Sequence, residues 1–181
     1  VVAEVDEQPR RSRSITILHT NDIHGHLLPW RGWEGDLAGK TIGGMDRLGG
    51  AIKQVQMQVG AHNTILLDAG DTLGDSMVAD ETKGRAIIEA MNALGYTAMV
   101  IGNHEPDFTA DTLKERIAEA KFPVLAANIT EKSTGRLFTL PYIMQEVRGV
   151  KVGILGLAYP NTPLTTAKDN IEGLEFGDAI T

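Results

Sequence analysis

The sequence predicts an α/β protein in which a mostly parallel sheet is followed by an antiparallel hairpin. Between residues 15 and 127, short apolar runs alternate with segments whose apolar residues recur every three or four positions. Alternating strands and helices form βαβ units, which build parallel sheets. From residue 142 this helical spacing ends, and two β-rich segments, 142–147 and 150–157, are joined through Arg148-Gly149. So short a connection predicts a hairpin with antiparallel strands.

The first part of the chain predicts two strands with one helix between them. Residues 15–19 predict the first strand. A loop rich in Gly and Trp follows over residues 29–44, which is long for a compact domain. The helix after it ends at Gly60. Its apolar face consists of Met45, Leu48, Ile52, Val55 and Val59. Residues 64–67 predict the second strand.

The alternation of strands and helices continues from there. A second helix, ended by Gly95, is predicted from Ile87, Ile88, Met91 and Leu94. Residues 97–101 predict the third strand, and residues 124–127 predict the fourth. Thr109 or Asp111 can cap a third helix between these two strands. In the third helix Leu113 and Ile117 face inward, and Pro123 stops it.

The two ends of the chain show no regular spacing of apolar residues. Residues 158–181 predict loop. Residues 1–13 are polar and predict a disordered tail, which leaves residues 14–181 as one domain.

Composition excludes several classes of function. Lys and Arg number 17 and Asp and Glu 24, so the net charge is −7, which argues against a nucleic-acid-binding surface. Such a balance also repels anionic substrates unless metal ions reverse the local field. The chain has no Cys, which excludes disulfides and thiolate zinc sites. No apolar stretch is long enough to span a bilayer.

Three polar clusters follow the first three predicted strands. They contain Asp22 and His24, then Asp71, then Asn103 and His104. In an open α/β sheet ligands bind beyond the carboxyl ends of the strands, so the clusters are expected to converge at one edge. Oxygen and nitrogen ligands of this kind can hold two divalent metal ions of manganese, zinc, iron or magnesium. A metal pair beside a histidine suits the hydrolysis of phosphate esters.

The two residues of the first cluster are predicted to bind the same metal ion. Residues two apart in an extended segment project to the same side, so Asp22 and His24 can hold one ion together. The alternative is an Asx turn at Asn21-Asp22 with His24 at the surface. His26 is expected at the rim of the site, and His19 within the strand.

The second and third clusters complete the predicted site. We expect Asp71, rather than Asp68, to bridge two ions, because Asp68 is closer to the strand and can hydrogen-bond within the loops. The alternative for Asp71 is an exposed turn residue. Asn103 supplies a neutral oxygen, or is simply part of a tight turn. Asp107 can orient His104 and favour its charged form, cap the following helix, or do both.

These segments resemble the signatures of the metallophosphoesterase (calcineurin-like) superfamily, and most closely its 5′-nucleotidase branch. The matching segments are Thr20-Asn21-Asp22-Ile23-His24-Gly25, Asp68-Ala69-Gly70-Asp71-Thr72 and Gly102-Asn103-His104-Glu105. Further similar stretches are 43–50, 126–129 and 149–153. The resemblance covers roughly residues 15 to 177 and implies the first half of a four-layer α/β/β/α sandwich.

The resemblance also implies roles for individual residues. Asp22 and His24 would hold one metal, Asp71 would bridge, and Asn103 would hold the second. His104 with Asp107 would form the catalytic pair. The implied substrates are nucleotides, nucleotide sugars or cyclic nucleotides, and the implied location is periplasmic, extracellular or at the cell surface, after removal of a signal peptide.

The chain departs from the family pattern at two points. Pro106 replaces an aromatic residue, fixes the local backbone and can shift Asp107. The family takes further metal-binding histidines from a later strand and a Gly-His-x-His loop, but no histidine follows His104. We therefore expect the N-terminal part of a catalytic domain, without its C-terminal half and nucleotide-binding domain. Weak metal binding, poor hydrolysis and an apolar sheet face covered by the missing half or a second copy are the expected consequences.

Other functions remain open at this point. Within the superfamily, the alternatives are a cyclic-nucleotide phosphodiesterase, a nucleotide-sugar hydrolase and a thiosulfohydrolase. A non-enzymatic alternative is a fragment that binds metal or phosphate without turnover. A doubly wound binding module would need a glycine-rich phosphate loop after the first strand, where this chain has Asn21-Asp22-Ile23-His24.

Overall fold

A four-stranded parallel sheet with the order β1-β4-β5-β6 forms the centre of the protein. The computed structural model describes residues 14–179, so the predicted tail over residues 1–13 lies outside the described residues. The strands of this sheet are β1 (Thr16–Thr20), β4 (Thr64–Asp68), β5 (Ala98–Val100) and β6 (Val124–Leu125). Each matches a strand predicted from the sequence, with ends that differ by one or two residues.

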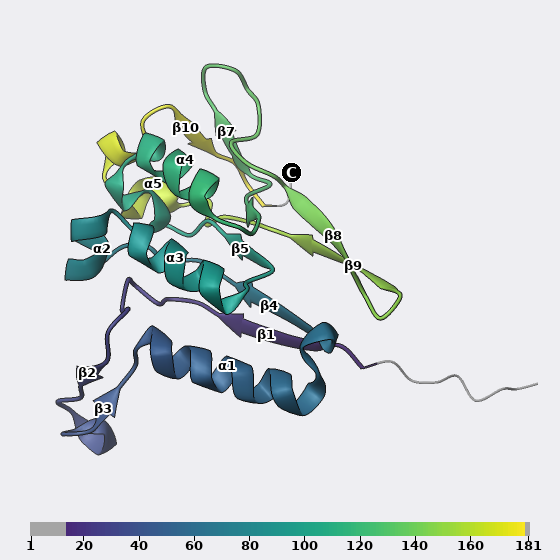
Figure 1. Cartoon of the computed structure of the whole chain (residues 1–181). Coiled ribbons are helices and arrows are strands. Elements are labelled where there is room, and N and C mark those ends of the chain that lie inside the picture. Colours follow the sequence, from purple (N-terminus) through teal and green to yellow (C-terminus); the bar gives the residue numbers. More distant parts are fainter. Residues whose placement is uncertain (1–13, 180–181) are drawn as a thin grey trace, which may run out of the picture.

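Each connection between successive strands of this sheet contains one α-helix of ten or more residues (Figure 1). These helices are α1 (Met45–Val59), α3 (Arg85–Leu94) and α4 (Ala110–Glu119). Gly60 and Gly95 end the first two, as the sequence predicts. Of the three possible caps for α4, which also include Asp107 and Asp111, Thr109 is the one used, since its hydroxyl accepts a hydrogen bond from Thr112 N at 3.2 Å.

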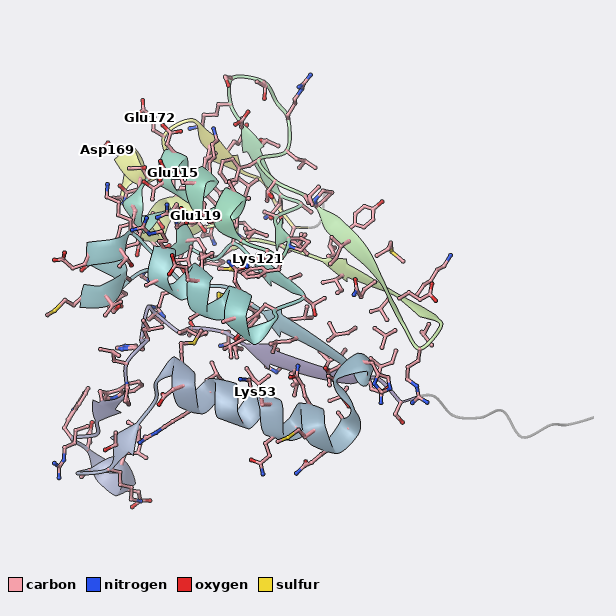
Figure 2. The ribbon with its side chains drawn as sticks, in the orientation of Figure 1. Lys53, Glu115, Glu119, Lys121, Asp169 and Glu172 are labelled. Atoms are coloured by element: carbon pink, nitrogen blue, oxygen red, sulfur yellow. The ribbon has the colours of Figure 1, made fainter. Side chains whose placement is uncertain are left out.

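The helices and the sheet share one hydrophobic core. Ile52, Met91 and Leu113 each bring the inner face of a different helix onto strand residues such as Leu66 and Met99. The outer faces of the helices are charged, and Figure 2 labels Lys53 on α1 with Glu115 and Glu119 on α4. This division of apolar and charged faces is the amphipathic pattern from which the helices were predicted.

The remaining elements are short or antiparallel. The predicted hairpin is confirmed as β8 (Tyr142–Val147) and β9 (Val150–Leu155). The long loop before α1 contains β2 (Trp30–Arg31), η1 (Gly35–Leu37) and β3 (Thr41–Ile42). The other short elements are η2 (Ala61–Asn63), α2 (Met77–Thr82), η3 (Glu105–Phe108), β7 (Ile129–Glu131), α5 (Thr162–Thr165), η4 (Lys168–Ile171) and β10 (Leu174–Phe176).

The expectation that residues 158–181 form only loop is wrong. The strand β10 pairs antiparallel with β7, with Phe176 opposite Ile129. Its length of three residues gives too little alternation to predict from the sequence, and the pairing joins segments more than 40 residues apart. Asn128 reinforces this join, because its side chain donates to the carbonyl oxygens of Ala158 and Gly177.

One face of the parallel sheet is left partly exposed. Right-handed crossovers between successive neighbouring strands place α1, α3 and α4 on the same face. On the other face, Ile17 of β1 is 57% exposed and Leu155 of β9 is 59% exposed. A groove there is lined by His19, Leu67, Ala98, Val100, Leu125 and Ile154. This exposure agrees with the sequence expectation of an apolar face that another segment or chain would cover.

Among residues 14–179, no helix combines the length and the apolar character needed to cross a membrane.

Candidate metal centre

Three loops meet where β1, β4 and β5 end. Asp22 N donates to Gly70 O at 2.9 Å, and His24 N donates to Asp71 O at 3.0 Å. These bonds continue the parallel pairing of β1 and β4 beyond the strands. The loop after β1 and the loop after β4 are therefore held side by side, which brings two of the predicted polar clusters together.

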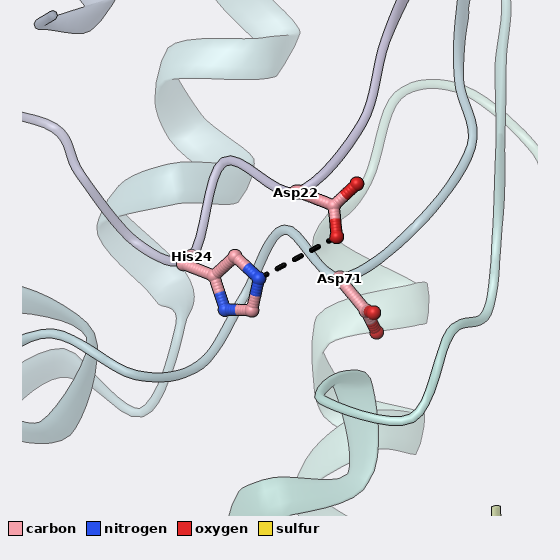
Figure 3. A group of neighbouring side chains, drawn as sticks. All are labelled: Asp22, His24 and Asp71. Carbon is pink, nitrogen blue, oxygen red and sulfur yellow. Dashed lines mark ion pairs between the residues drawn. The ribbon is translucent and has the colours of Figure 1, made fainter.

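The side chains of Asp22, His24 and Asp71 form a candidate metal centre. One ligand atom from each lies within 4.8 Å of the others. His24 Nε2 is 3.6 Å from Asp22 Oδ1, and Figure 3 shows the ring directed towards that carboxylate, with Asp71 beside it. Two carboxylates and an imidazole are ligand types that bind divalent cations. The donor set and its spacing therefore fit such a cation.

All three of these residues have a left-handed backbone conformation. Their φ angles are 52° for Asp22, 48° for His24 and 56° for Asp71. This conformation costs most residues other than glycine about 1–2 kcal/mol, and aspartate less than most, and such strain gathers at functional sites. The expectation that Asp22 and His24 project together from an extended segment is wrong. A turn brings their side chains together instead.

His104 and Asp107 lie beside this group and contact each other. His104 Nδ1 is 2.8 Å from Asp107 Oδ2, and the His104 ring lies edge-on to the His24 ring with centroids 4.7 Å apart. The backbone N–H of His104 donates to Asp71 Oδ1 at 3.0 Å. The carboxylate of Asp107 therefore orients His104, and Asp71 fixes the backbone that carries it.

The surroundings of His104 favour its charged form. Burial on its own lowers the pKa of His104, but the hydrogen bond and the charge of Asp107 raise it, as do the charges of Asp71 and Asp75. The net result is a pKa above the ordinary value for histidine. Protonated His104 therefore stabilises the folded state fully below about pH 6.5, and this contribution is lost as the pH rises through the raised pKa.

Replacing Asp107 with asparagine is expected to lower the pKa of His104, because the strongest partner of its charged form is removed. The measurement is an NMR titration of the histidine rings in protein freed of divalent cations with a chelator. Asp111→Asn serves as the control, since the Asp111 side chain is 95% exposed and lies on α4. An unchanged His104 pKa in Asp107→Asn would contradict this assignment of the pair.

Asn103 and Asp68 are the two remaining acid or amide groups of the predicted site. Asn103 follows β5 and precedes His104, and its carbonyl oxygen accepts a hydrogen bond from Thr166 Oγ1 at 2.8 Å. Asp68 is 3% exposed and accepts hydrogen bonds from Thr20 Oγ1 and Thr72 Oγ1. Both carboxylate oxygens of Asp68 are therefore hydrogen-bonded within the loops, as the sequence suggested.

Glu105 is a further residue of the site, to which the sequence analysis gave no role. Its side chain is buried, and its two carboxylate oxygens accept four backbone hydrogen bonds. The donors are the N–H groups of Asp71 (3.0 Å), Thr72 (2.7 Å), Leu73 (3.3 Å) and Gly102 (2.6 Å). Burial raises the pKa of Glu105 to about 7, and the hydrogen bonds oppose this rise. One side chain thus joins the loop after β4 to the loop after β5.

Two glycines permit the close approach of these loops. A Cβ atom on Gly102 would overlap the Oδ1 atom of Asp71, and a Cβ atom on Gly74 would overlap the Oδ2 atom of Asp107. Pro106 lies in the first turn of η3 and is buried. It leaves the contact between His104 and Asp107 intact, so this departure from the family pattern does not separate the pair.

The other histidines lie outside this cluster. His19 is within β1, as the sequence predicts. His26 is exposed, and its ring lies 4.7 Å from that of Trp30. His62 is exposed in η2.

A parallel sheet with carboxylate and imidazole groups gathered at its carboxyl edge suits the class of metal-dependent hydrolases. Comparison with known protein families identifies one family within this class, because the family model of the calcineurin-like phosphoesterases matches residues 15–166. The chain belongs to the calcineurin-like phosphoesterase family.

Several curated relatives are 5′-nucleotidases. The chain is 36% identical over 175 residues to a snake venom 5′-nucleotidase of Naja atra, covering 93% of this chain and 32% of the relative. It is 34% identical over 169 residues to the protein UshA of Escherichia coli, covering 92% of this chain and 29% of the relative. The chain thus spans about a third of the length of these relatives.

Solved structures confirm the fold. A 5′-nucleotidase precursor from Thermus thermophilus matches with a TM-score of 0.77 and 32% identity, covering 91% of this chain and 32% of that one. A sulfate thiohydrolase, SoxB, from the same organism matches with a TM-score of 0.80 and 20% identity, covering 92% and 39%. The α/β class predicted from the sequence, with its parallel sheet and antiparallel hairpin, is therefore confirmed as that of the N-terminal part of such proteins.

Proposed function

We propose that this chain is the N-terminal part of a 5′-nucleotidase-like enzyme that hydrolyses phosphate monoesters of nucleotides or related compounds with two divalent metal ions. The observation that carries the proposal is the group of Asp22, His24 and Asp71, whose ligand atoms lie within 4.8 Å of one another next to the bonded pair of His104 and Asp107. The 5′-nucleotidases among the relatives support the choice of substrate class.

The residues divide into metal ligands and a proton-handling pair. Asp22 and His24 would hold one ion, Asp71 would bridge, and Asn103 would hold the second ion with its amide oxygen. Divalent ions at such a site, of manganese, zinc, iron or magnesium, supply an activated water and stabilise negative charge on phosphoryl oxygens. The identity of the metals is open to direct measurement by elemental analysis of purified protein.

His104 would act on the leaving group. Because Asp107 engages Nδ1, Nε2 is left to face the substrate, and the raised pKa of His104 favours the protonated ring. A protonated ring beside the candidate metal centre can donate a proton to the departing oxygen or stabilise the charge that forms on it. Asp71 would contribute here too, since its Oδ1 atom fixes the backbone of His104.

The proposal is tested by phosphate release from 5′-AMP in the presence of Mn²⁺. The 181-residue chain alone is expected to be a poor catalyst, because its relatives are about three times longer. Joining it to the remainder of a full-length relative is expected to give robust hydrolysis that His104→Ala removes. Failure of the complemented protein to hydrolyse any phosphate ester would overturn the proposal, and robust turnover by the chain alone would overturn the expected impairment.

A substrate panel separates the alternatives within the family. Preference for a nucleotide sugar or a cyclic nucleotide over 5′-AMP would assign those activities instead. Hydrolytic release of sulfate from a sulfonate group bound to sulfur would favour the thiosulfohydrolase alternative. The SoxB structure shares the fold at 20% identity. Cation binding by the complemented protein without turnover on any of these compounds would indicate an inactive binding protein.

We also propose that the exposed sheet face is covered by a C-terminal half or by a second copy of the chain. The exposed side chains of Ile17 and Leu155 and the largely apolar groove on this face support this, as does the greater length of the relatives. The proposed location is periplasmic, extracellular or at the cell surface, in keeping with the venom proteins among the relatives. Cell fractionation followed by immunoblotting tests the location.

A further inference from the structure

The imidazole of His24 has one ring nitrogen without a hydrogen-bond partner. Nε2 faces Asp22 and the candidate metal centre, whereas Nδ1 is buried and unpaired. An imidazole that offers Nε2 as a ligand must carry its proton on Nδ1, so Nδ1 becomes a donor. A buried donor without an acceptor costs about 1–3 kcal/mol. The arrangement therefore calls for an acceptor beside Nδ1.

The carboxylate of Asp75 lies in the place that this acceptor would occupy. Asp75 Oδ2 is 3.6 Å from His24 Nδ1, about 0.7 Å longer than a typical N–H···O hydrogen bond. The Asp75 side chain is 69% exposed, so a small change in its torsion angles can close the remaining distance.

The backbone on both sides of Asp75 is anchored near the site. Before it, Gly74 is buried against the loop that carries His104 and Asp107. After it, Ser76 caps α2 and donates a hydrogen bond to Gly25 O at 2.7 Å, next to His24. Asp75 itself has a φ of 70°, a left-handed conformation that aspartate tolerates better than most residues. The anchored backbone therefore holds the Asp75 side chain beside Nδ1 of His24.

The other groups around His24 face different parts of the ring or are engaged elsewhere. Asp22 faces Nε2. The ring of His104 lies edge-on at a centroid distance of 4.7 Å, and its own Nδ1 contacts Asp107. Asp71 belongs to the ligand group on the Nε2 side.

We propose that Asp75 is a positioning residue, which accepts a hydrogen bond from Nδ1–H of His24 and so presents Nε2 to the cation as an unprotonated ligand. The inference rests on the proposed metal function of His24 and adds to it the residue that sets the ring tautomer. A carboxylate, an imidazole and a cation in sequence is a common arrangement in metal sites, and losing the carboxylate there typically weakens metal binding about 10–100-fold.

The test compares Asp75→Gly and Asp75→Asn with the 181-residue parent chain. Glycine removes the acceptor without straining the left-handed backbone, and asparagine keeps a neutral acceptor oxygen. Asp80→Ala is the matched control, because Asp80 is an exposed acid in the first turn of α2. Mn²⁺ affinity is measured by electron paramagnetic resonance, and thermal unfolding confirms that each variant is folded.

A second measurement reports the ring directly and needs no metal. In ¹⁵N-labelled protein at about pH 8.5, roughly two units above the ordinary histidine pKa, the nitrogen shifts distinguish the two neutral tautomers. The parent is expected to hold its proton on Nδ1 of His24, whereas Asp75→Gly is expected to show a mixture. A role in packing alone would leave this ratio unchanged.

The outcomes separate this inference from the proposed function. About 10–100-fold weaker Mn²⁺ binding in Asp75→Gly, a smaller loss in Asp75→Asn, none in Asp80→Ala and a changed tautomer ratio would support the role of Asp75. Equal affinity and an unchanged ratio in Asp75→Gly would overturn it and leave the metal site standing. No Mn²⁺ binding by the parent or by the complemented full-length protein would overturn both.

Discussion

Asp71→Ala is expected to reduce the affinity of this chain for Mn²⁺ by more than about 100-fold, beyond the range typical for residues that only support a ligand. The carboxylate of Asp71 is the member of the candidate metal centre that joins two loops. Its oxygens lie with Asp22 and His24, and its Oδ1 atom also accepts the backbone N–H of His104. The substitution therefore removes both a ligand and the anchor of the neighbouring histidine.

Asp71→Asn separates these two contributions. The amide oxygen can still accept the hydrogen bond from His104 N, but the negative charge and the second carboxylate oxygen are lost. We expect cation binding to fall nearly as far as in Asp71→Ala, while thermal stability is closer to that of the parent. Binding is measured by titration with Mn²⁺, with Asp80→Ala as the control for loss of an exposed acid. Affinity within a factor of two or so of the parent in both Asp71 variants would mean that Asp71 is not a ligand.

Glu105→Ala is expected to lower the free energy of unfolding by at least about 3 kcal/mol. The carboxylate of Glu105 accepts four backbone hydrogen bonds from the loops after β4 and β5. An alanine leaves these buried donors without an acceptor and opens a cavity beside Thr72. Since small domains are stabilised by about 5–15 kcal/mol in total, a loss of this size is a large fraction.

Urea unfolding measures this loss of stability. A second substitution at Glu105 tests whether the loss comes from the backbone hydrogen bonds. In Glu105→Gln one side-chain oxygen can still serve one pair of donors, while the amide N–H₂ group faces the other pair. Its loss of stability is expected to fall between those of the parent and the alanine variant. Glu89→Ala is the control, because Glu89 is exposed on α3. If Glu105→Ala unfolds at the same urea concentration as the control, Glu105 does not hold the loops together.

The three long helices, and the succession of strands and helices along the chain, follow from local sequence pattern. The apolar spacing from Met45 to Val59 and the glycine after it predict α1 with both of its ends. Such patterns are visible because each residue of an amphipathic helix records whether it faces the core. The sequence does not predict the helix α2, because its six residues complete fewer than two turns of this pattern and its Met77 is 81% exposed.

The composition of the candidate site is also written in the sequence. Asp22, His24, Asp71 and His104 follow predicted strands, and parallel strands end at the same edge of a sheet. That rule alone indicates which side chains gather, and the structure brings all four together. The metal roles of these residues, and that of Asn103, remain predictions.

Tertiary structure alone decided how these side chains are held. The left-handed turns at Asp22, His24 and Asp71 cost energy locally and persist only because the paired loops impose them. Likewise, Glu105 acts on residues more than 30 positions away, and Asp75 approaches His24 from another loop. Sequence pattern reports the burial and conformation that neighbouring residues prefer. Contacts between distant loops depend on the folded sheet, so the sequence determined which residues form the site and the fold determined their geometry.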